Sequence, residues 1–87
     1  MEIRKQAIAG TLQSNDCQVR IVPGEGGIDL SIESSVMETF GKQIEKVIRE
    51  TLARLNVEQC RILVEDRGAL DYTIRARVET AVRRAYE

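Results

Sequence analysis

The chain contains no histidine and no tryptophan, and it has two cysteines, one proline, two tyrosines and one phenylalanine among its 87 residues. Histidine is the side chain that changes charge nearest neutral pH, so its absence removes the commonest general base and metal ligand. Cys17 and Cys60 lie far apart without a C-x-x-C motif, which leaves too few nitrogen or sulfur ligands for zinc. We expect both thiols to be buried and reduced, although the sequence leaves a disulfide between them open.

The chain also lacks an excess of positive or negative charge. Thirteen Lys and Arg residues face fourteen Asp and Glu residues, so the formal net charge is -1 and no long-range field attracts nucleic acid or anionic membranes. The few aromatic residues are too scattered to stack on bases. No apolar run approaches the length of a membrane span or of a secretory signal. We therefore expect a cytoplasmic protein with neither a nucleic-acid nor a membrane partner.

What the sequence does contain predicts one small folded domain over residues 1–87. Apolar residues make up 43% of the chain and charged residues 31%, which is typical of a soluble globular fold. Apolar and polar side chains alternate over 7–12, 17–21 and 28–33, as expected for three strands. The intervening segments 13–16 and 23–27 are interpreted as hairpin loops, because they are polar or rich in glycine.

A long helical pattern follows Ser34 and Ser35, and Ser35 with Glu38 is suited to a capping box. Its inward stripe is predicted to hold Met37, Phe40, Ile44, Val47, Ile48, Leu52 and Leu55. Asn56 is a suitable left-handed stop. A fourth strand over 60–64 ends at 65–68.

A second helix runs from about Leu70 to the end of the chain. Its inward residues are predicted to be Leu70, Ile74, Val78, Ala81, Val82 and Ala85. The βββαβα order favours an α+β two-layer sandwich: a mostly antiparallel four-stranded sheet with two helices on one face. The strand over 28–33 reaches the next strand through a helix, so it is expected to lie parallel to a neighbour.

Several segments that resemble chemical sites are interpreted as structural instead. The glycine-rich 24–27 segment lacks a phosphate-loop ending and leads into a strand, not a helix. Glu65 and Asp66 are neighbours on a strand and point to opposite faces, so they cannot act as an acid/base pair and are interpreted as a solvated strand end. The arginines of the last helix, Arg75, Arg77, Arg83 and Arg84, form no focused patch and are interpreted as a solvated face, with partner docking as a second interpretation.

Ser14 lies near the tip of the polar loop over 13–16. By itself a serine in a turn indicates only a turn former. Its hydroxyl is a poor nucleophile, and no histidine is present to activate it. Covalent chemistry at Ser14 would therefore require a separate enzyme, to which Asn15 and Asp16 would keep the loop tip polar and open.

Two blocks together resemble the acyl carrier protein, or gamma subunit, of citrate lyase. The first is residues 9–16 (AGTLQSND), and the second is residues 66–71 (DRGALD), followed by 74–79 (IRARVE); residues 28–30 (IDL) add to the likeness. In that family the serine of the first block, Ser14 here, carries a phosphoribosyl dephospho-coenzyme A group through a phosphodiester. The resemblance covers nearly the whole chain, in order and at matching spacing.

The resemblance implies a non-catalytic carrier in a cytoplasmic complex. An alpha subunit would exchange the acetyl group on the carrier thiol for citrate, and a beta subunit would cleave the citryl thioester to oxaloacetate. A dedicated transferase would load the prosthetic group onto Ser14. A covalent tether of this kind replaces diffusion between active sites with a high effective concentration.

Two alternatives stay open. The carrier subunit of malonate decarboxylase is similar in role and uses the same type of group, but the GALD segment at 68–71 fits citrate lyase better. A small noncovalent interaction or RNA-binding module would leave Ser14 unmodified. The four-helix acyl carriers of fatty-acid synthesis are not similar, because their serine begins a helix whereas Ser14 follows a strand.

Overall fold

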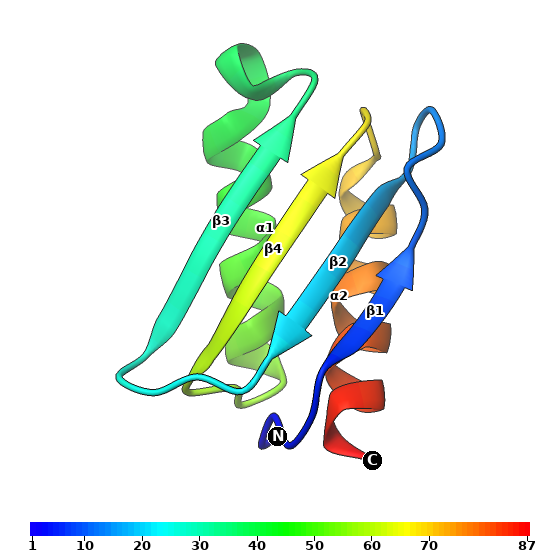
Figure 1. The fold of residues 1–87 in the computed structure, drawn as a ribbon. Coiled ribbons are helices and arrows are strands. Elements are labelled where there is room, and N and C mark those ends of the chain that lie inside the picture. Colours follow the sequence, from blue (N-terminus) through cyan, green and yellow to red (C-terminus); the bar gives the residue numbers. More distant parts are fainter.

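A computed structural model describes all residues 1–87, and its elements follow the order βββαβα (Figure 1). The strands are β1 (Ala7–Gly10), β2 (Cys17–Val22), β3 (Ile28–Ser34) and β4 (Cys60–Asp66), and the helices are α1 (Met37–Arg54) and α2 (Asp71–Tyr86). The predicted number, type and order of elements are confirmed. Asn56 ends α1 with a φ of 56°, as expected for a left-handed stop.

The four strands form one sheet in the order β1-β2-β4-β3. β2 pairs antiparallel with β1 and with β4, whereas β3 runs parallel to β4, so the parallel neighbour expected for the third strand is confirmed. The 23–27 segment is not a hairpin loop, because β4 lies between β2 and β3. β3 and β4 are joined through α1, and this crossover places β4 in the middle of the sheet.

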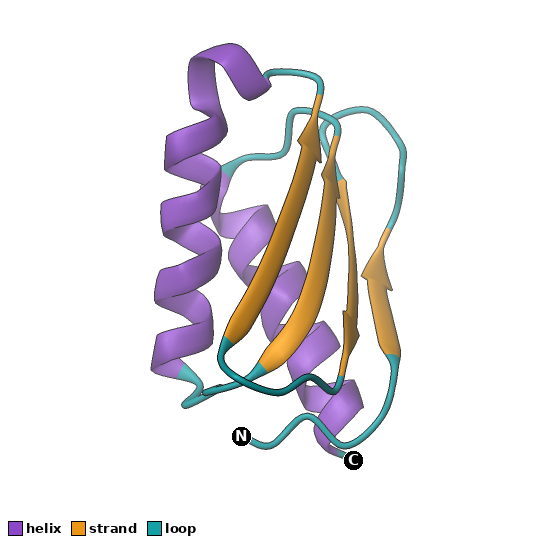
Figure 2. Cartoon of the chain, turned by 60° about the vertical axis from the view of Figure 1, so that its left-hand side comes forward, coloured by secondary structure: helices purple, strands orange, loops and turns teal.

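Both helices cover the same face of the sheet, and the other face is open (Figure 2). The core between the layers contains the inward side chains of β2 and β4 and the facing stripes of the helices, with Ile21, Ile48, Leu52, Ile62 and Ile74 among its largest buried members. On β1 the small residues Ala7 and Ala9 face inward, while Ile8 is exposed. The predicted α+β two-layer sandwich is confirmed.

Three apolar residues predicted to be inward are exposed: Met37 by 44%, Phe40 by 52% and Leu70 by 58%. They belong to the beginnings of the two helices, and in Figure 1 the first turn of α1 extends beyond the end of β3, where no layer faces it. The predicted capping box at Ser35 and Glu38 is also wrong. Val36 precedes α1 without a side-chain cap, and the Val36 N–H donates to Ser34 Oγ at 3.1 Å.

The N-terminus of the chain lies beside the C-terminal end of α1. The Met1 ammonium group donates to the carbonyl oxygens of Leu55 at 2.5 Å and Asn56 at 2.8 Å, directly after α1. A positive charge at this position suits the negative end of the helix dipole. Neither helix combines the length and apolar character that a membrane span requires.

Candidate functional site

Ser14 lies at one end of the molecule, in the loop that joins β1 to β2 (Figure 1). We call residues 11–16 the Ser14 loop. Ser14 is exposed, and so are Gln13 and Asn15 beside it. The backbone nevertheless has fixed contacts: the Thr11 N–H donates to the Cys17 carbonyl at 3.1 Å, and the Asp16 N–H donates to the Gln13 carbonyl at 3.2 Å. The hydroxyl is therefore presented to solvent from an ordered turn.

Asp16 anchors this loop from within. Its carboxylate accepts hydrogen bonds from Arg77 Nε at 3.0 Å and Arg77 Nη2 at 2.8 Å, from Thr11 Oγ1 at 2.7 Å, and from the Cys17 N–H at 2.7 Å. The hydrogen bonds from Arg77 are the main cause that lowers the pKa of Asp16 to about 2. A bidentate arginine fixes the orientation of a carboxylate as well as its charge. The Ser14 loop is thus tied to α2.

Gly10 makes room for the Cys17 carbonyl group and for the side chain of Arg77. Its φ is +89°, a value that side chains disfavour, and a Cβ there would lie 1.9 Å from the Cys17 carbonyl oxygen and 3.1 Å from Arg77 Cδ. Glycine is therefore required where β1 ends and the loop begins.

A second turn, which we call the Asp66 turn (residues 66–70), supports the Ser14 loop from the neighbouring strand. The Asn15 N–H donates to the Arg67 carbonyl at 2.8 Å, and the Arg67 N–H donates to the Asp16 carbonyl at 2.9 Å. These bonds extend the β2–β4 pairing past the strand ends into both turns. The Ser14 loop is consequently held on two sides, by α2 and by the Asp66 turn.

Asp66 is fully buried, so its interpretation as part of a solvated strand end is wrong. Its carboxylate accepts hydrogen bonds from Ser34 Oγ at 2.8 Å, the Gly68 N–H at 3.1 Å and the Ala69 N–H at 2.9 Å. One carboxylate therefore shapes its own turn and also joins it to the end of β3. Burying a carboxylate is tolerated only when its oxygens are satisfied in this way.

Arg77 is the site residue that sequence reasoning missed. The sequence pattern predicts a solvated position for it, but its guanidinium group donates to the carboxylate of Asp16, 61 residues earlier in the chain. Nothing local in the sequence distinguishes it from Arg75, Arg83 or Arg84. Only the packing of α2 against β1 and β2 brings its side chain to the Ser14 loop.

The site offers an exposed hydroxyl but no means of activating it. Asp16, the nearest acid along the chain, is engaged by Arg77, and the chain has no histidine. Both cysteines are buried and free, and burial is the main cause that raises the pKa of Cys17 to about 12 and that of Cys60 to about 11. No group of three cysteine, aspartate or glutamate side chains lies close enough together to hold a metal ion. The arrangement suits a hydroxyl that another enzyme modifies.

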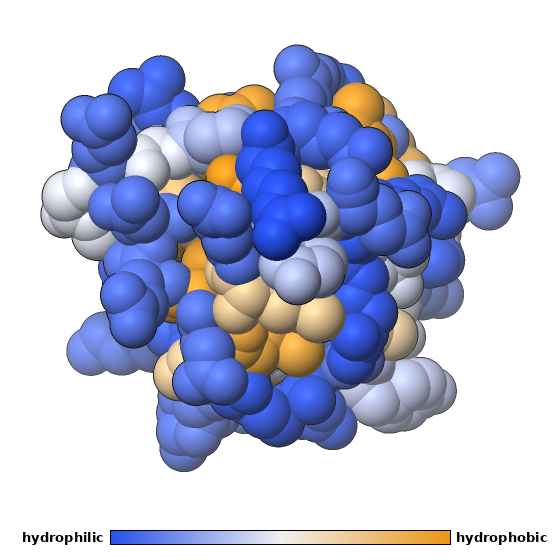
Figure 3. Space-filling model, turned by 90° about the horizontal axis from the view of Figure 1, so that it is seen from below, coloured by the Kyte–Doolittle hydropathy of each residue, from blue (hydrophilic) through white to orange (hydrophobic).

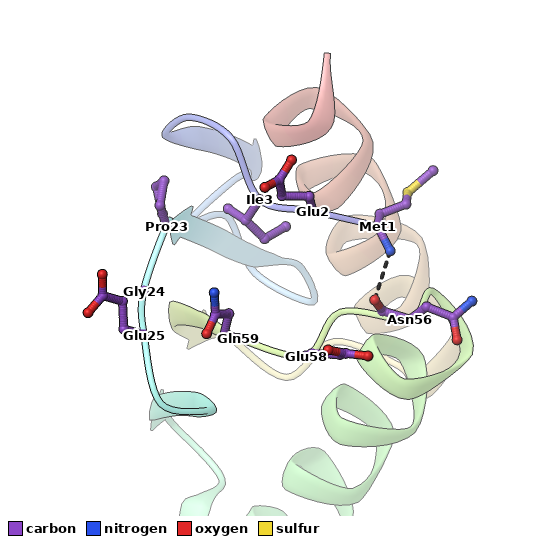
Figure 4. Close-up of a pocket in the computed structure, with 9 residues that line it drawn as sticks. All are labelled: Met1, Glu2, Ile3, Pro23, Gly24, Glu25, Asn56, Glu58 and Gln59. Atoms are coloured by element: carbon purple, nitrogen blue, oxygen red, sulfur yellow. Dashed lines mark hydrogen bonds between the residues drawn. The ribbon is translucent and has the colours of Figure 1, made fainter.

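A pocket of about 660 Å³ lies at the opposite end, where polar side chains surround a small apolar area (Figure 3). The first residues of the chain, the 23–25 segment and the 56–59 segment line it (Figure 4). Its charged side chains are Glu2, Glu25 and Glu58, beside the Met1 ammonium group, and none is a nucleophile paired with a base. The glycines at 26 and 27 have positive φ and lie in the bent segment that leads into strand β3, not into a helix as in a phosphate loop. The pocket and the Ser14 loop therefore have no residue in common.

Comparisons with known proteins cover almost the whole chain. A family model described as the malonate decarboxylase delta subunit matches residues 4–85. A citrate lyase acyl carrier protein of Treponema denticola is 54% identical over 87 residues, covering 100% of this chain and 99% of that protein. A citrate lyase acyl carrier protein of Escherichia fergusonii is 54% identical over 88 residues, with 100% and 91% covered, and one of Haemophilus influenzae is 51% identical over 85 residues, with 98% and 88% covered.

A solved structure has the same fold. One chain of a crystal structure of a Pseudomonas malonate decarboxylase hetero-tetramer in complex with malonate matches with a TM-score of 0.84, covering 95% of this chain and 86% of that one. The two sequences are 21% identical, a level at which the likeness speaks for the architecture alone.

Proposed function

This chain belongs to the citrate lyase acyl carrier protein family, and from that premise we propose that it is the carrier subunit of a citrate lyase, with Ser14 as the attachment point of a phosphoribosyl dephospho-coenzyme A group. The group would be joined to Ser14 Oγ through a phosphodiester. When bound, it supplies a terminal thiol on which acyl groups are carried as thioesters. The partners would be the alpha and beta subunits and the transferase that loads the group.

The observation that carries this proposal is the presentation of Ser14. Its side chain is exposed, while the two residues that follow it are held by Arg67 and Arg77. A carrier needs this combination, because the loading enzyme must reach the hydroxyl and the root of the arm must stay fixed while the arm moves between active sites. The residues fit the group: a hydroxyl at the surface, no free carboxylate beside it in the loop, and the cationic side chain of Arg67 in the adjoining turn.

In this proposal the chain contributes position, not catalysis. The Asp16–Arg77 pair and the Asp66 turn set where the arm leaves the domain. The buried thiols of Cys17 and Cys60 stay protonated at neutral pH, because their pKa values are raised to about 12 and about 11. Acyl groups would therefore not be diverted to the protein's own cysteines.

The test is the intact mass of the protein purified from its native cell. We expect one large adduct, of a mass equal to the prosthetic group joined by a phosphodiester, with or without an acyl group on its thiol. The Ser14→Ala variant should lack the adduct and keep its fold. Ser35→Ala is the matched control, since Ser35 is another exposed serine, in the turn between β3 and α1, and this variant should keep the adduct.

An unmodified native protein, or an adduct that persists in Ser14→Ala, would contradict the proposal. The unmodified outcome would favour a noncovalent α+β interaction module. Protein made in a host without the transferase is not the sample for this test, because the group would never be attached there.

A second candidate function is the carrier subunit of malonate decarboxylase, which the matching family model favours. Both functions predict the adduct, so mass alone does not separate them. The activity that copurifies with the protein from its native cell does separate the two functions. Citrate lyase activity should copurify with the wild-type protein and be lost in the Ser14→Ala variant. If malonate decarboxylase activity follows it instead, the second function is correct.

A further inference from the structure

We propose that Arg67, in the Asp66 turn, is a phosphate-binding residue, and that its guanidinium group pairs with the phosphate attached to Ser14 Oγ. The inference rests on the proposed function, which places a phosphodiester on Ser14. It assigns a partner to a side chain that has none within the domain.

The backbone places Arg67 beside the loop tip. Hydrogen bonds of 2.8 and 2.9 Å join Arg67 to Asn15 and Asp16, the two residues that follow Ser14. Residues paired across an antiparallel ladder have Cα atoms about 4.5–5.5 Å apart. The two turns also lie side by side in Figure 1, as the tips after β4 and between β1 and β2. A long arginine side chain at this position is within reach of a group carried by the residue before Asn15.

The same pairing fixes the side from which Arg67 approaches. Asp66 is fully buried on the helix side of the sheet, and Arg67, next along the extended backbone, is exposed. Gly68 then turns the chain with a φ of +85°, and a Cβ there would lie 3.7 Å from Asn15 Oδ1. The turn therefore packs closely on the Ser14 loop while the Arg67 side chain stays in solvent.

Arg67 is also one of only two arginines whose guanidinium groups make no hydrogen bond or ion pair within the chain; the other is Arg75. Arg75 lies two residues before Arg77 on α2, which is about 200° around the helix, so it faces away from the Ser14 loop. Arg77 itself is occupied by Asp16. Arg67 is thus the free cation beside Ser14.

The acidic side chains nearest Arg67 have other partners. Glu65, two residues before Arg67 and on the same face of the strand, lies 3.9 Å from Arg20. The Asp16 carboxylate is bonded to Arg77 and Thr11, and the Asp66 carboxylate lies on the buried side, bonded to Ser34 and its own turn. Asp71, at the start of α2, accepts a hydrogen bond from Gln43 at 2.9 Å. The Ser14 N–H, which has no acceptor within the chain, adds a second donor next to the phosphate. A guanidinium fork and a backbone N–H are the donors that phosphate oxygens prefer.

The test uses phosphoserine installed at position 14 of the full chain, which needs no transferase. A phosphomonoester has a second pKa near about 6, and a neighbouring cation lowers it. Phosphorus NMR titration should give a pKa about 0.2–0.7 lower in the wild-type background than in Arg67→Gln, as expected for an exposed ion pair. Arg67→Lys should be intermediate, Arg75→Gln should match the wild type, and added salt should shrink the difference.

The inference would be overturned if the phosphoserine at position 14 had the same pKa in the wild-type background and in Arg67→Gln, with NMR spectra that show the same fold for both proteins. An equal effect of Arg75→Gln would also overturn it, because that would reflect net charge alone. Failure of the proposed function is a separate result: it would appear as a native protein without an adduct, whatever the phosphoserine titration shows. In native loaded protein, the Arg67 Nε–H resonance should also shift relative to the unloaded protein, while that of Arg75 should not.

Discussion

Arg77 on α2 donates two hydrogen bonds, of 3.0 and 2.8 Å, to the two carboxylate oxygens of Asp16, across 61 residues of chain. The side chain of Asp16 is 14% exposed and that of Arg77 is 39% exposed, so the pair lies at the edge of the core. This contact ties the loop that carries Ser14 to a helix from the other end of the sequence. The contact therefore restrains the exposed Ser14 loop.

Replacing Arg77 with glutamine should lower the free energy of unfolding by about 1–2 kcal/mol, because Asp16 loses its bidentate partner while it stays largely buried. Urea unfolding should show a lower midpoint with an unchanged slope. The amide of Asn15 should exchange faster with solvent, since the loop is loosened locally. Arg75→Gln is the control and should change stability by less than about 0.5 kcal/mol. An effect of Arg75→Gln equal to that of Arg77→Gln would contradict the role given to the ion pair.

The same pair predicts how stability depends on acid. The folded pKa of Asp16 is lowered from 3.8 to about 2, with the Arg77 hydrogen bonds as the main cause. The stabilisation is therefore fully present above pH 3.8 and is lost as the pH falls toward about 2. After allowance for the exposure of Arg77, the loss should be about 1–2 kcal/mol.

Asp16→Asn isolates this effect, because asparagine does not titrate. Its free energy of unfolding should be lower than that of the wild type at neutral pH, and the difference should narrow as the pH approaches about 2. Urea midpoints measured at several pH values check this. A difference that stays constant through the acid range would show that Asp16 is not the group responsible.

Asp66→Ala should lower the free energy of unfolding by about 2–4 kcal/mol, because it leaves part-buried donors from Ser34, Gly68 and Ala69 without an acceptor. Asp66→Asn keeps one acceptor oxygen and should recover part of the loss. Glu65→Gln, next to it on the open side of the sheet, is the control and should be nearly neutral. Thermal or urea unfolding measures all three variants, and a neutral Asp66→Ala would show that the Asp66 turn does not depend on this carboxylate.

The folded protein without its prosthetic group should have no thiol that reacts with Ellman's reagent near pH 8. Cys17 and Cys60 are both fully buried, and their pKa values are raised to about 12 and about 11. Denaturant should expose both cysteines. Loaded protein whose prosthetic group carries no acyl group should show one rapidly reacting thiol, which is supplied by that group and is lost in Ser14→Ala. Rapid reaction of Cys17 or Cys60 in the folded unloaded protein would contradict their burial.

Local pattern was enough to predict the number, type and order of the elements. The strands over β2, β3 and β4 alternate clearly, and the middle of each helix carries a regular apolar stripe, so each segment has one face that must be buried. The prediction failed at the helix beginnings. Met37, Phe40 and Leu70 continue the apolar periodicity, but burial also requires a facing layer, and periodicity contains no information about where the sheet ends.

The sequence by itself determined that Ser14 lies in a polar loop directly after a strand, in a chain with no side chain to activate it. The tertiary structure alone decided how that serine is held. The insertion of β4 between β2 and β3 brings Arg67 and Asp66 beside the Ser14 loop, and the packing of α2 brings Arg77 to Asp16. These contacts join residues roughly 50 to 60 positions apart, and contacts of that range depend on how whole layers pack, which no local pattern of side chains encodes.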